Sequence, residues 1–416
     1  MVNIAILGCG VVGSGVLQVL NQNQAHIQRK AGQSIAVAHV LDRREIPGVA
    51  VTQDFEAILA DASVQIVVEV MGGLQPAYDY VKRALLAGKH VVTSNKELVI
   101  AHGAELLAIA RERQLNFMFE ASVGGGIPVV RPINVALTTD RIVAIGGILN
   151  GTSNYMITRM GGVGASYAAA FAEACEKGYA EAGSTADTGG FDACRKLAIL
   201  LSLATGKQVD YQDITTEGIE SIDAADFAFA RAFGLHIKPM VSGRILPDGV
   251  AAVSAPFLVH PSNVLSAVSG VNNGVVVQAA ATGDIMFYGP GAGQLPTAGA
   301  VVSDIVDVAN HLHRHIMHDW HAEKMPVLPQ AQYVSAKMVR VAYNTADHAC
   351  IPALEAFLCR YLNLPSGPVA VTAKEHPGFA AFITPQQNHA ATQTLLARLR
   401  EMPGITGVER VLRVYD

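Results

Sequence analysis

The sequence predicts an α/β protein whose first part is a parallel sheet with helices on both faces. Short apolar strands at 2–7, 35–41, 65–70, 90–93 and 116–119 alternate with helical patterns, of which the clearest are at 76–86 and 97–112. This alternation is typical of parallel sheets in which each crossover is a helix. With 416 residues, half of them hydrophobic and 16% charged, the chain is long enough for two or three domains.

Composition excludes several classes of partner. A net charge of -5 provides no basic field for nucleic acid or for an anionic membrane surface. No uninterrupted apolar run approaches the length of a membrane span, and the N-terminal segment has no basic region ahead of its apolar run. The five cysteines form no C-x-x-C pair, which favours a reducing compartment. We therefore expect a cytoplasmic protein without a membrane or nucleic-acid partner.

The glycine-rich segment GCGVVG at 8–13 follows the first strand and opens a helix. In that context Gly8 is expected to allow a tight turn, Gly10 a close approach of the backbone to a pyrophosphate, and Gly13 close packing of helix on strand. Val11 and Val12 fall in the first helical turn, where N–H groups and the helix dipole favour phosphate. The segment predicts a Rossmann-type dinucleotide site.

The second strand ends in Asp42-Arg43-Arg44. An acid at this point binds the ribose 2′-hydroxyl of NAD, whereas an arginine accommodates the 2′-phosphate of NADP. Both residue types are present, and the two adjacent arginines favour NADP. For Arg44, a solvated turn of charges is the competing interpretation.

Two further loops carry candidate residues. Thr93, Ser94 and Lys96 follow a strand at the edge where open α/β sheets bind ligands, so Lys96 is a candidate for contacting cofactor or substrate, or else a solvated lysine at a helix start. Glu120 precedes three consecutive glycines at 124–126, and a carboxylate beside a carbonyl-rich turn suits a hard cation. The alternative for the glycines is a hinge between domains.

The segment 178–196 places Glu181, Asp187, Asp192 and Lys196 ahead of an uncharged run at 197–204. Charges at the mouth of a buried helix are either paired or functional. Asp192 and Lys196 are four residues apart and share one face if the segment is helical. Taken alone, this segment favours a surface ion pair at a helix start.

The motifs together resemble homoserine dehydrogenases. The resemblance rests on GCGVVG, TSNKEL, EASVGGGIPV, GILNGTSNYM and a GYAE segment followed by GFDACRKL, in that order through nearly all of 1–320. The block at 147–200 is its most specific part. The family interconverts L-aspartate 4-semialdehyde and L-homoserine with NAD(P)H, on the route to threonine, methionine and isoleucine.

The resemblance implies roles for individual residues. Lys96 and Lys196 would be the active-site lysines, with Lys196 favoured as proton donor and acceptor, and Glu181, Asp187 and Asp192 would hold homoserine. Glu120 and the carbonyls of Val123, Gly125 and Ile127 would form a sodium site. Gly178 and Gly293 would add cofactor contacts. The chain departs from the family at Gly183-Ser184, where Asp-Pro is usual, so substrate affinity could differ.

The resemblance also implies the domain organisation. We expect a discontinuous nucleotide-binding domain (1–130 with 291–325), an α+β substrate and dimerisation domain with an open mixed sheet (131–290), and a C-terminal βαββαβ domain of the ACT type (330–416). A homodimer or homotetramer is expected. The ACT ligand loop is replaced by Asn344 to His348, so no effector is assigned.

A long helix at 295–316 would place His311 and His315 on one face, with His318 farther along. For these histidines, a solvated helix face is preferred to a metal site.

Two other functions remain open from the sequence. One is an NAD(P)-binding regulatory protein that kept the fold and lost turnover. The other is a dehydrogenase of a different small amino acid on the same scaffold. Retention of both Lys96 and Lys196 favours an active enzyme over a retired one.

Overall fold

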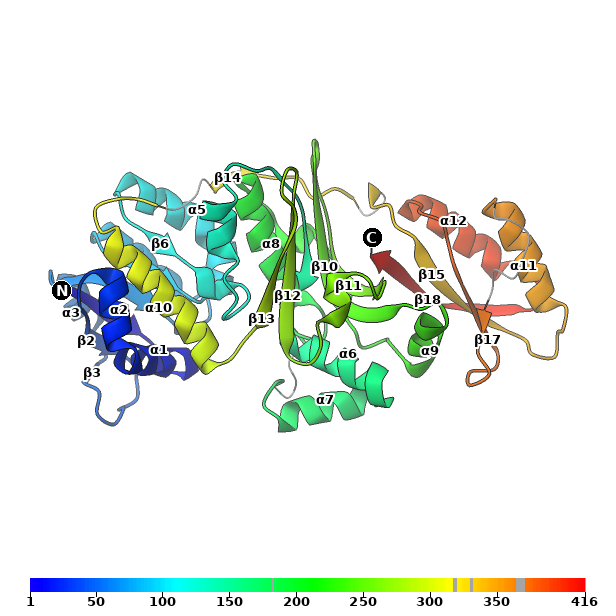
Figure 1. The fold of residues 1–416 in the computed structure, drawn as a ribbon, viewed down its shortest axis with the longest axis horizontal. Coiled ribbons are helices and arrows are strands. Elements are labelled where there is room, and N and C mark those ends of the chain that lie inside the picture. Colours follow the sequence, from blue (N-terminus) through cyan, green and yellow to red (C-terminus); the bar gives the residue numbers. More distant parts are fainter. Residues whose placement is uncertain (182, 184, 317–319, 330–331, 364–370, 416) are drawn as a thin grey trace. The chain divides into compact units, whose positions relative to one another are not determined.

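The computed structural model describes residues 1–181, 183, 185–316, 320–329, 332–363 and 371–415 (Figure 1). Ser184 and His318 lie outside these ranges. The chain forms two compact units, and each is described by itself. Unit 1 comprises Met1–Ile145, Cys194–Asp213 and Asn273–Pro326, and unit 2 comprises Gly146–Ala193, Ile214–Asn272 and Val327–Asp416.

Unit 1 contains the predicted parallel sheet. Its six strands lie in the order β3-β2-β1-β4-β5-β6, with the chain reversing direction across the sheet between β1 and β4. The strands are β1 (Val2–Leu7), β2 (Ile35–Leu41), β3 (Val51–Thr52), β4 (Val64–Glu69), β5 (His90–Thr93) and β6 (Phe117–Met118). This is the doubly wound order, in which ligands bind outside the carboxyl ends of the strands at the reversal.

Helices cover this sheet because both faces of its strands are apolar. The helices between the strands are α1 (Val11–Gln22), α2 (Gln24–Ala31), α3 (Phe55–Ala60), α4 (Ala77–Leu86) and α5 (Lys96–Glu112). Alternate residues Val2, Ile4 and Ile6 pack with α1 and α2 in one core, while Ala5 and Leu7 are equally buried. The prediction of a sheet covered on both faces is confirmed.

Later segments of the chain complete unit 1. Helix α10 (Gln294–Asn310) lies beside α1 and α2 although it comes far later in the chain (Figure 1). The remaining elements are the 3-10 turn η1 (Glu120–Ser122), the π-helical η2 (Pro132–Ala136), most of α8 (Phe191–Thr205), β8 (Lys207–Gln208), η3 (Tyr211–Asp213), β12 (Asn272–Ala279), β13 (Gly283–Pro290) and β14 (His321–Lys324). Strand β7 (Ile142–Ile148) runs from unit 1 into unit 2.

Unit 2 is built on a mixed sheet. Strands β10 (His236–Leu246) and β11 (Gly249–Val259) form a long antiparallel hairpin, and β11 also pairs in parallel with β9 (Thr215–Thr216) and with the last strand of the chain. Helices α6 (Gly151–Val163), α7 (Tyr167–Glu176) and α9 (Ala224–Ala232) share a core with β10, and η4 (Val264–Ala267) follows the hairpin. The predicted mixed sheet is confirmed.

The C-terminal part of unit 2 has the expected βαββαβ order. Its elements are β15 (Lys337–Tyr343), α11 (Cys350–Tyr361), β16 (Val371–Thr372), β17 (Phe379–Ile383), α12 (His389–Arg400) and β18 (Ile405–Tyr415). The strands run β18-β15-β17-β16, and β18 continues the sheet of β11. Arg340 of β15 contacts Asp223, the residue before α9, through two 2.7 Å hydrogen bonds. The C-terminal part is thus joined to the rest of unit 2 by these bonds as well as by the pairing of β18 with β11. The three-domain division remains a prediction.

Helix α10 is shorter than expected. The sequence pattern continued to residue 316, but the helix ends at Asn310. The next carbonyls bond to the sheet instead: His311 and Arg314 each accept from the Asn116 amide at 3.0 Å. His311 and His315 are therefore not on one helical face, and no group of metal-ligating side chains occurs within the described ranges. Among the helices that the structure describes, none has the length and apolar character to cross a membrane.

Candidate active site

The glycine turn at the end of β1 has the geometry that its sequence predicts. Gly8 has φ +90°, and a Cβ there would lie 2.8 Å from Met71 Cγ. At Gly13 a Cβ would lie 2.1 Å from the carbonyl oxygen of Gly8, so only glycine fits. Gly10 precedes α1 without a side-chain cap, and no atom lies within 4 Å of its Cβ position. This leaves the helix N-terminus, with Val11 and Val12, open to an anionic ligand.

Asp42 and the two arginines after β2 behave differently from one another. The Asp42 carboxylate accepts hydrogen bonds from the Cys9 backbone N–H at 2.8 Å and from Nε and Nη2 of Arg44, both at 3.0 Å. The hydrogen bonds from the Arg44 side chain hold the pKa of Asp42 below its usual range. Arg43 is exposed, and within the described ranges its guanidinium has no hydrogen bond or ion pair. Arg44 is thus a partner of Asp42, whereas Arg43 is available to a ligand.

A buried acid organises the carboxyl edge of the sheet. Leu7, Glu69 and Thr93 stand in register on β1, β4 and β5. The Glu69 carboxylate accepts from the Met71 N–H at 2.8 Å and from the Thr93 hydroxyl at 2.6 Å, and burial raises its pKa. Asn95 caps α5 by accepting from the Leu98 N–H at 3.1 Å. These bonds determine the path of the loop that carries Ser94 and Lys96, the latter being the first residue of α5.

Gly293 lies on a loop that packs against the glycine-rich turn at 124–126. It has φ +119° and precedes α10. A Cβ on Gly125 would lie 2.6 Å from the carbonyl carbon of Gly291, and the Gly126 N–H donates to the Pro290 carbonyl at 3.3 Å. The structure therefore brings the predicted cofactor contact Gly293 and the predicted cation loop together in unit 1.

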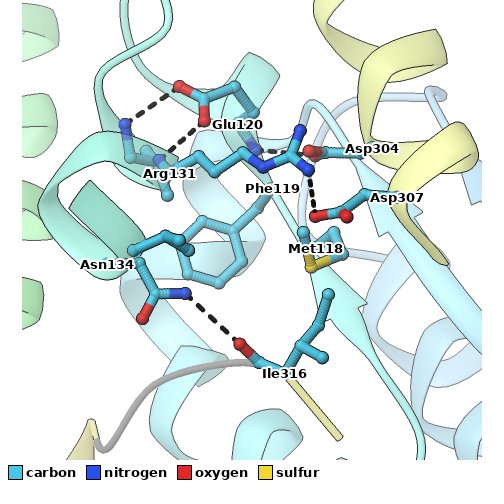
Figure 2. Close-up of a pocket in the computed structure, with 10 residues that line it drawn as sticks. Met118, Phe119, Glu120, Arg131, Asn134, Asp304, Asp307 and Ile316 are labelled. Atoms are coloured by element: carbon cyan, nitrogen blue, oxygen red, sulfur yellow. Dashed lines mark hydrogen bonds and ion pairs between the residues drawn. The ribbon is translucent and has the colours of Figure 1, made fainter. Parts of the chain in front are cut away.

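The carboxylate of Glu120 is directed at the backbone. It accepts from the N–H groups of Val129 at 2.6 Å, Val130 at 2.9 Å and Arg131 at 2.7 Å. Figure 2 shows this carboxylate turned toward the backbone of Arg131. Burial raises its pKa. Its own N–H donates to Asp304 at 2.9 Å, and Arg131 pairs with Asp307 at 2.6 Å. Both oxygens of this carboxylate therefore already have backbone partners, and its role as a cation ligand remains a prediction.

The carbonyls of the turn fit a hard cation better. Val123, Gly125 and Ile127 are buried, and within the described ranges their carbonyl oxygens accept no hydrogen bond. Buried carbonyls without partners are rare in native proteins. Oxygen ligands of this kind suit a hard cation.

Two of the three predicted substrate acids converge on one amide. Asn150 Nδ2 donates to Asp187 at 2.7 Å and to Asp192 at 2.9 Å. The amide is oriented by its oxygen, which accepts from the N–H and hydroxyl of Ser153 and so caps α6. Asp192 is 3% exposed in the first turn of α8, and Asp187 is half-buried. The side-chain amide of Asn150 therefore holds the carboxylates of Asp187 and Asp192 close together.

Glu181 is not part of this pair. Its side chain is exposed, and within the described ranges it has no hydrogen bond or ion pair. Gly178, with φ +72°, ends α7 nearby, and Thr152 of α6 donates to the carbonyl of Tyr179 at 2.5 Å. This bond connects the segment to the start of α6.

Lys196 lies one helical turn after Asp192 on α8, as the spacing predicts. Lys96 and Lys196 both belong to unit 1, whereas Glu181, Asp187 and Asp192 belong to unit 2. Both lysines are half-buried.

Comparisons with known proteins identify the family. Residues 8–120 match the model described as Homoserine dehydrogenase, NAD binding domain, and residues 128–306 match the model described as Homoserine dehydrogenase. A homoserine dehydrogenase of Pseudomonas aeruginosa is 35% identical over 99% of this chain and 98% of its own length. The chain belongs to the homoserine dehydrogenase family.

Other members of the homoserine dehydrogenase family agree in sequence and structure. The protein of Mycobacterium tuberculosis is 42% identical over 74% of this chain and 73% of its own length. The crystal structure of a homoserine dehydrogenase from Thiobacillus denitrificans covers 100% of this chain and 98% of its own, at 32% identity and a TM-score of 0.90. The chain is thus an oxidoreductase with the family's NAD-binding and catalytic domains.

Sequence reasoning missed two residues that shape the site. Asn150 occurs in the GILNGTSNYM motif without a predicted role, although an asparagine that caps a helix with its side-chain oxygen can still donate from its NH2 group. Glu69 lies in the predicted strand at 65–70, but no role was predicted for it. An acid at the carboxyl end of a central strand indicates a polar site, because a buried carboxylate requires hydrogen-bond partners.

Proposed function

We propose that this protein catalyses the reversible, NAD(P)-dependent interconversion of L-aspartate 4-semialdehyde and L-homoserine. The observation that carries the proposal is the acid pair Asp187 and Asp192, held by Asn150 at the start of the helix that bears Lys196. Homoserine has an ammonium group, and an ammonium needs carboxylate or carbonyl acceptors once it leaves water. Paired acids beside a lysine are the composition that this substrate requires.

Asp187 and Asp192 bind the substrate ammonium in this proposal. Asp187 accepts one hydrogen bond from the described side chains, so its carboxylate has further acceptor capacity. Glu181, on the exposed segment after α7, is the third acid proposed to hold homoserine.

Lys196 donates and accepts the proton of the reacting oxygen in this proposal. The bound nicotinamide supplies or accepts the hydride. As the aldehyde is reduced, its oxygen takes a proton from the Lys196 ammonium; in the reverse direction neutral Lys196 takes the hydroxyl proton. Lys96, at the ligand-binding edge of the sheet, orients the reacting oxygen by donating a hydrogen bond.

NADP is the proposed preferred dinucleotide. The other residues proposed to contact the dinucleotide are Gly8, Gly10, Val11, Val12, Gly13, Thr93, Ser94, Gly178 and Gly293. Arg43 is the proposed partner of the 2′-phosphate, because Arg44 is occupied by Asp42. In steady-state kinetics Arg43→Ala should raise the KM for NADP about tenfold and leave that for NAD nearly unchanged. A strong NAD preference in the unmodified enzyme would contradict this choice.

A sodium ion is proposed at the glycine turn. The carbonyls of Val123, Gly125, Ile127 and Glu120 would hold it, and the Glu120 carboxylate would support the turn from behind. We also propose a homodimer or homotetramer, a cytoplasmic location and an ACT-like C-terminal domain at 330–416, to which no effector is assigned. The βαββαβ order of the C-terminal elements supports the last of these.

Substitution of the two lysines tests the proposal. Lys196→Ala and Lys96→Ala should each lower homoserine-dependent reduction of NAD(P) by at least about 100-fold, the usual contribution of a positioned proton donor. Dinucleotide binding, measured by fluorescence titration, should persist. Lys207→Ala is the matched control, because this lysine near the end of α8 forms an exposed ion pair with Glu323 and should be dispensable. Full turnover in both lysine variants would refute the mechanism.

A further inference from the structure

A cavity lies in unit 2, away from the acid pair. It has a volume of about 320 Å³ and is formed by α6, α9, the start of β10 and η4. It reaches α6 at Ile157 and Gly161, at least about 10 Å along the helix axis from Asn150. None of the residues proposed to bind substrate or dinucleotide lines it.

A buried lysine faces this cavity without an opposite charge. Lys238 is 8% exposed, and its ammonium donates to the Val268 carbonyl at 2.6 Å. An ammonium has three donors, and within the described ranges Lys238 forms no ion pair. Burial lowers the pKa of Lys238, in keeping with an environment that lacks a carboxylate. A buried charge without a partner is costly, and an anionic ligand would remove that cost.

The neighbouring charges do not supply the missing anion. No acidic residue lines the cavity, which also contains Arg231 and His236. Within the described ranges the side chains of Arg231 and His236 form no hydrogen bond or ion pair. The nearest acids along α9 are committed elsewhere, since Asp223 contacts Arg340 and Asp226 contacts Arg410. Arg231 also suits the C-terminal end of α9, but that explanation does not apply to Lys238 on a strand.

The rest of the wall is largely apolar. Ile157, Phe227, Leu235 and Ile237 line the cavity, and Ser269 adds a hydroxyl. We propose that this cavity binds a small aliphatic carboxylate, with its charge on Lys238 and its hydrocarbon part against Phe227 and Leu235. The volume of this cavity and its lining, which is mostly apolar with a few polar groups, are typical of sites that bind small molecules. The site is independent of the proposed active site.

Calorimetric titration of the full chain with 3-methylbutanoate tests this proposal. The acid should bind saturably, and 3-methylbutan-1-ol, which has the same skeleton without charge, should bind at least about tenfold more weakly. Lys238→Met, which keeps the side-chain volume, should weaken acid binding by a similar factor. Lys337→Met is the matched control, because Lys337 is also buried in unit 2 but donates to two carbonyls. Lys196→Ala should retain binding, which separates this site from the active site.

A second variant covers the possibility that Lys238→Met does not fold. Gly162 lines the cavity, and no atom lies within 4 Å of its Cβ position, so Gly162→Leu fills open space. It should abolish binding without loss of fold. Absence of saturable binding to the unmodified chain, unchanged binding in Gly162→Leu, or inorganic phosphate binding as tightly as the carboxylate would each overturn the proposal.

Discussion

Glu120 in unit 1 and Asp187 in unit 2 are both acids beside glycine-rich turns, yet their surroundings differ in one respect. Glu120 is 5% exposed and accepts three backbone N–H groups. Asp187 is half-buried, and within the described ranges its carboxylate accepts one hydrogen bond, from the Asn150 side chain. A carboxylate can accept about four hydrogen bonds, so Asp187 keeps room for a ligand and Glu120 keeps little.

The difference teaches that residue type and neighbouring glycines do not decide the role of an acid. The partners decide it. A carboxylate filled by backbone donors holds a loop in place and contributes to stability, whereas one held by a single side-chain amide remains able to bind an ammonium group. The following substitutions break or sharpen this contrast, from the largest expected effect to the smallest.

Asn150→Asp should have the largest effect. The new carboxylate still caps α6 by accepting from the Ser153 N–H, but it removes the donor shared by Asp187 and Asp192 and adds a third negative charge beside them. Steady-state kcat/KM for homoserine should fall by about 100-fold or more, because two hydrogen bonds to charged groups are lost. Asn388→Asp, at the N-cap of α12, is the control and should leave kcat/KM unchanged. Comparable losses in both variants would mean that only capping matters.

Glu120→Gln should act on stability and not on recognition. An amide cannot accept three N–H groups with its single oxygen, so at least one buried donor loses its partner. Urea denaturation should show a loss of about 3 kcal/mol in the free energy of unfolding. The exposed Glu112→Gln on α5 should show almost none. A stable Glu120→Gln variant with a raised KM for homoserine would reverse the contrast.

His90 extends the contrast to pH. Its Nδ1 accepts from the Asn116 N–H at 3.0 Å and its Nε2 contacts the Leu312 carbonyl at 3.1 Å, and burial lowers its pKa to about 4. The unfolded chain takes up this proton near pH 6.5 and the folded chain only near 4, so stability falls as the pH drops through that window. Urea denaturation should show that the free energy of unfolding falls by about 2 kcal/mol between pH 7 and 5, and that this fall is absent in His90→Gln. Equal losses in both proteins would show that other groups carry the effect.

Much of the fold and part of the site could be predicted from sequence. The glycine pattern at 8–13 reports backbone geometry directly, because Gly13 has no room for a Cβ and Gly8 needs a positive φ. The i, i+4 placement of Asp192 and Lys196 follows from helical periodicity. Such features depend on residues close together in the chain.

The features that could not be predicted depend on contacts between distant residues. Nothing local indicates that Arg44 folds back on Asp42 while Arg43 points to solvent, or that the amide of Asn150 reaches an acid 37 residues later. The end of α10 at Asn310 has the same origin, because the carbonyls beyond it bond to Asn116 and His90. Periodicity describes the helix but not the competitors for its hydrogen bonds.

The most direct measurement compares two substrates in the Asp187→Asn variant. 4-Hydroxybutanoate lacks the ammonium group of homoserine and otherwise keeps its carbon chain, carboxylate and hydroxyl. If Asp187 binds the ammonium, the ratio of kcat/KM for homoserine to that for 4-hydroxybutanoate should fall by at least about tenfold in the variant, the value of one hydrogen bond between charged groups. An unchanged ratio, with both activities lowered alike, would contradict the account.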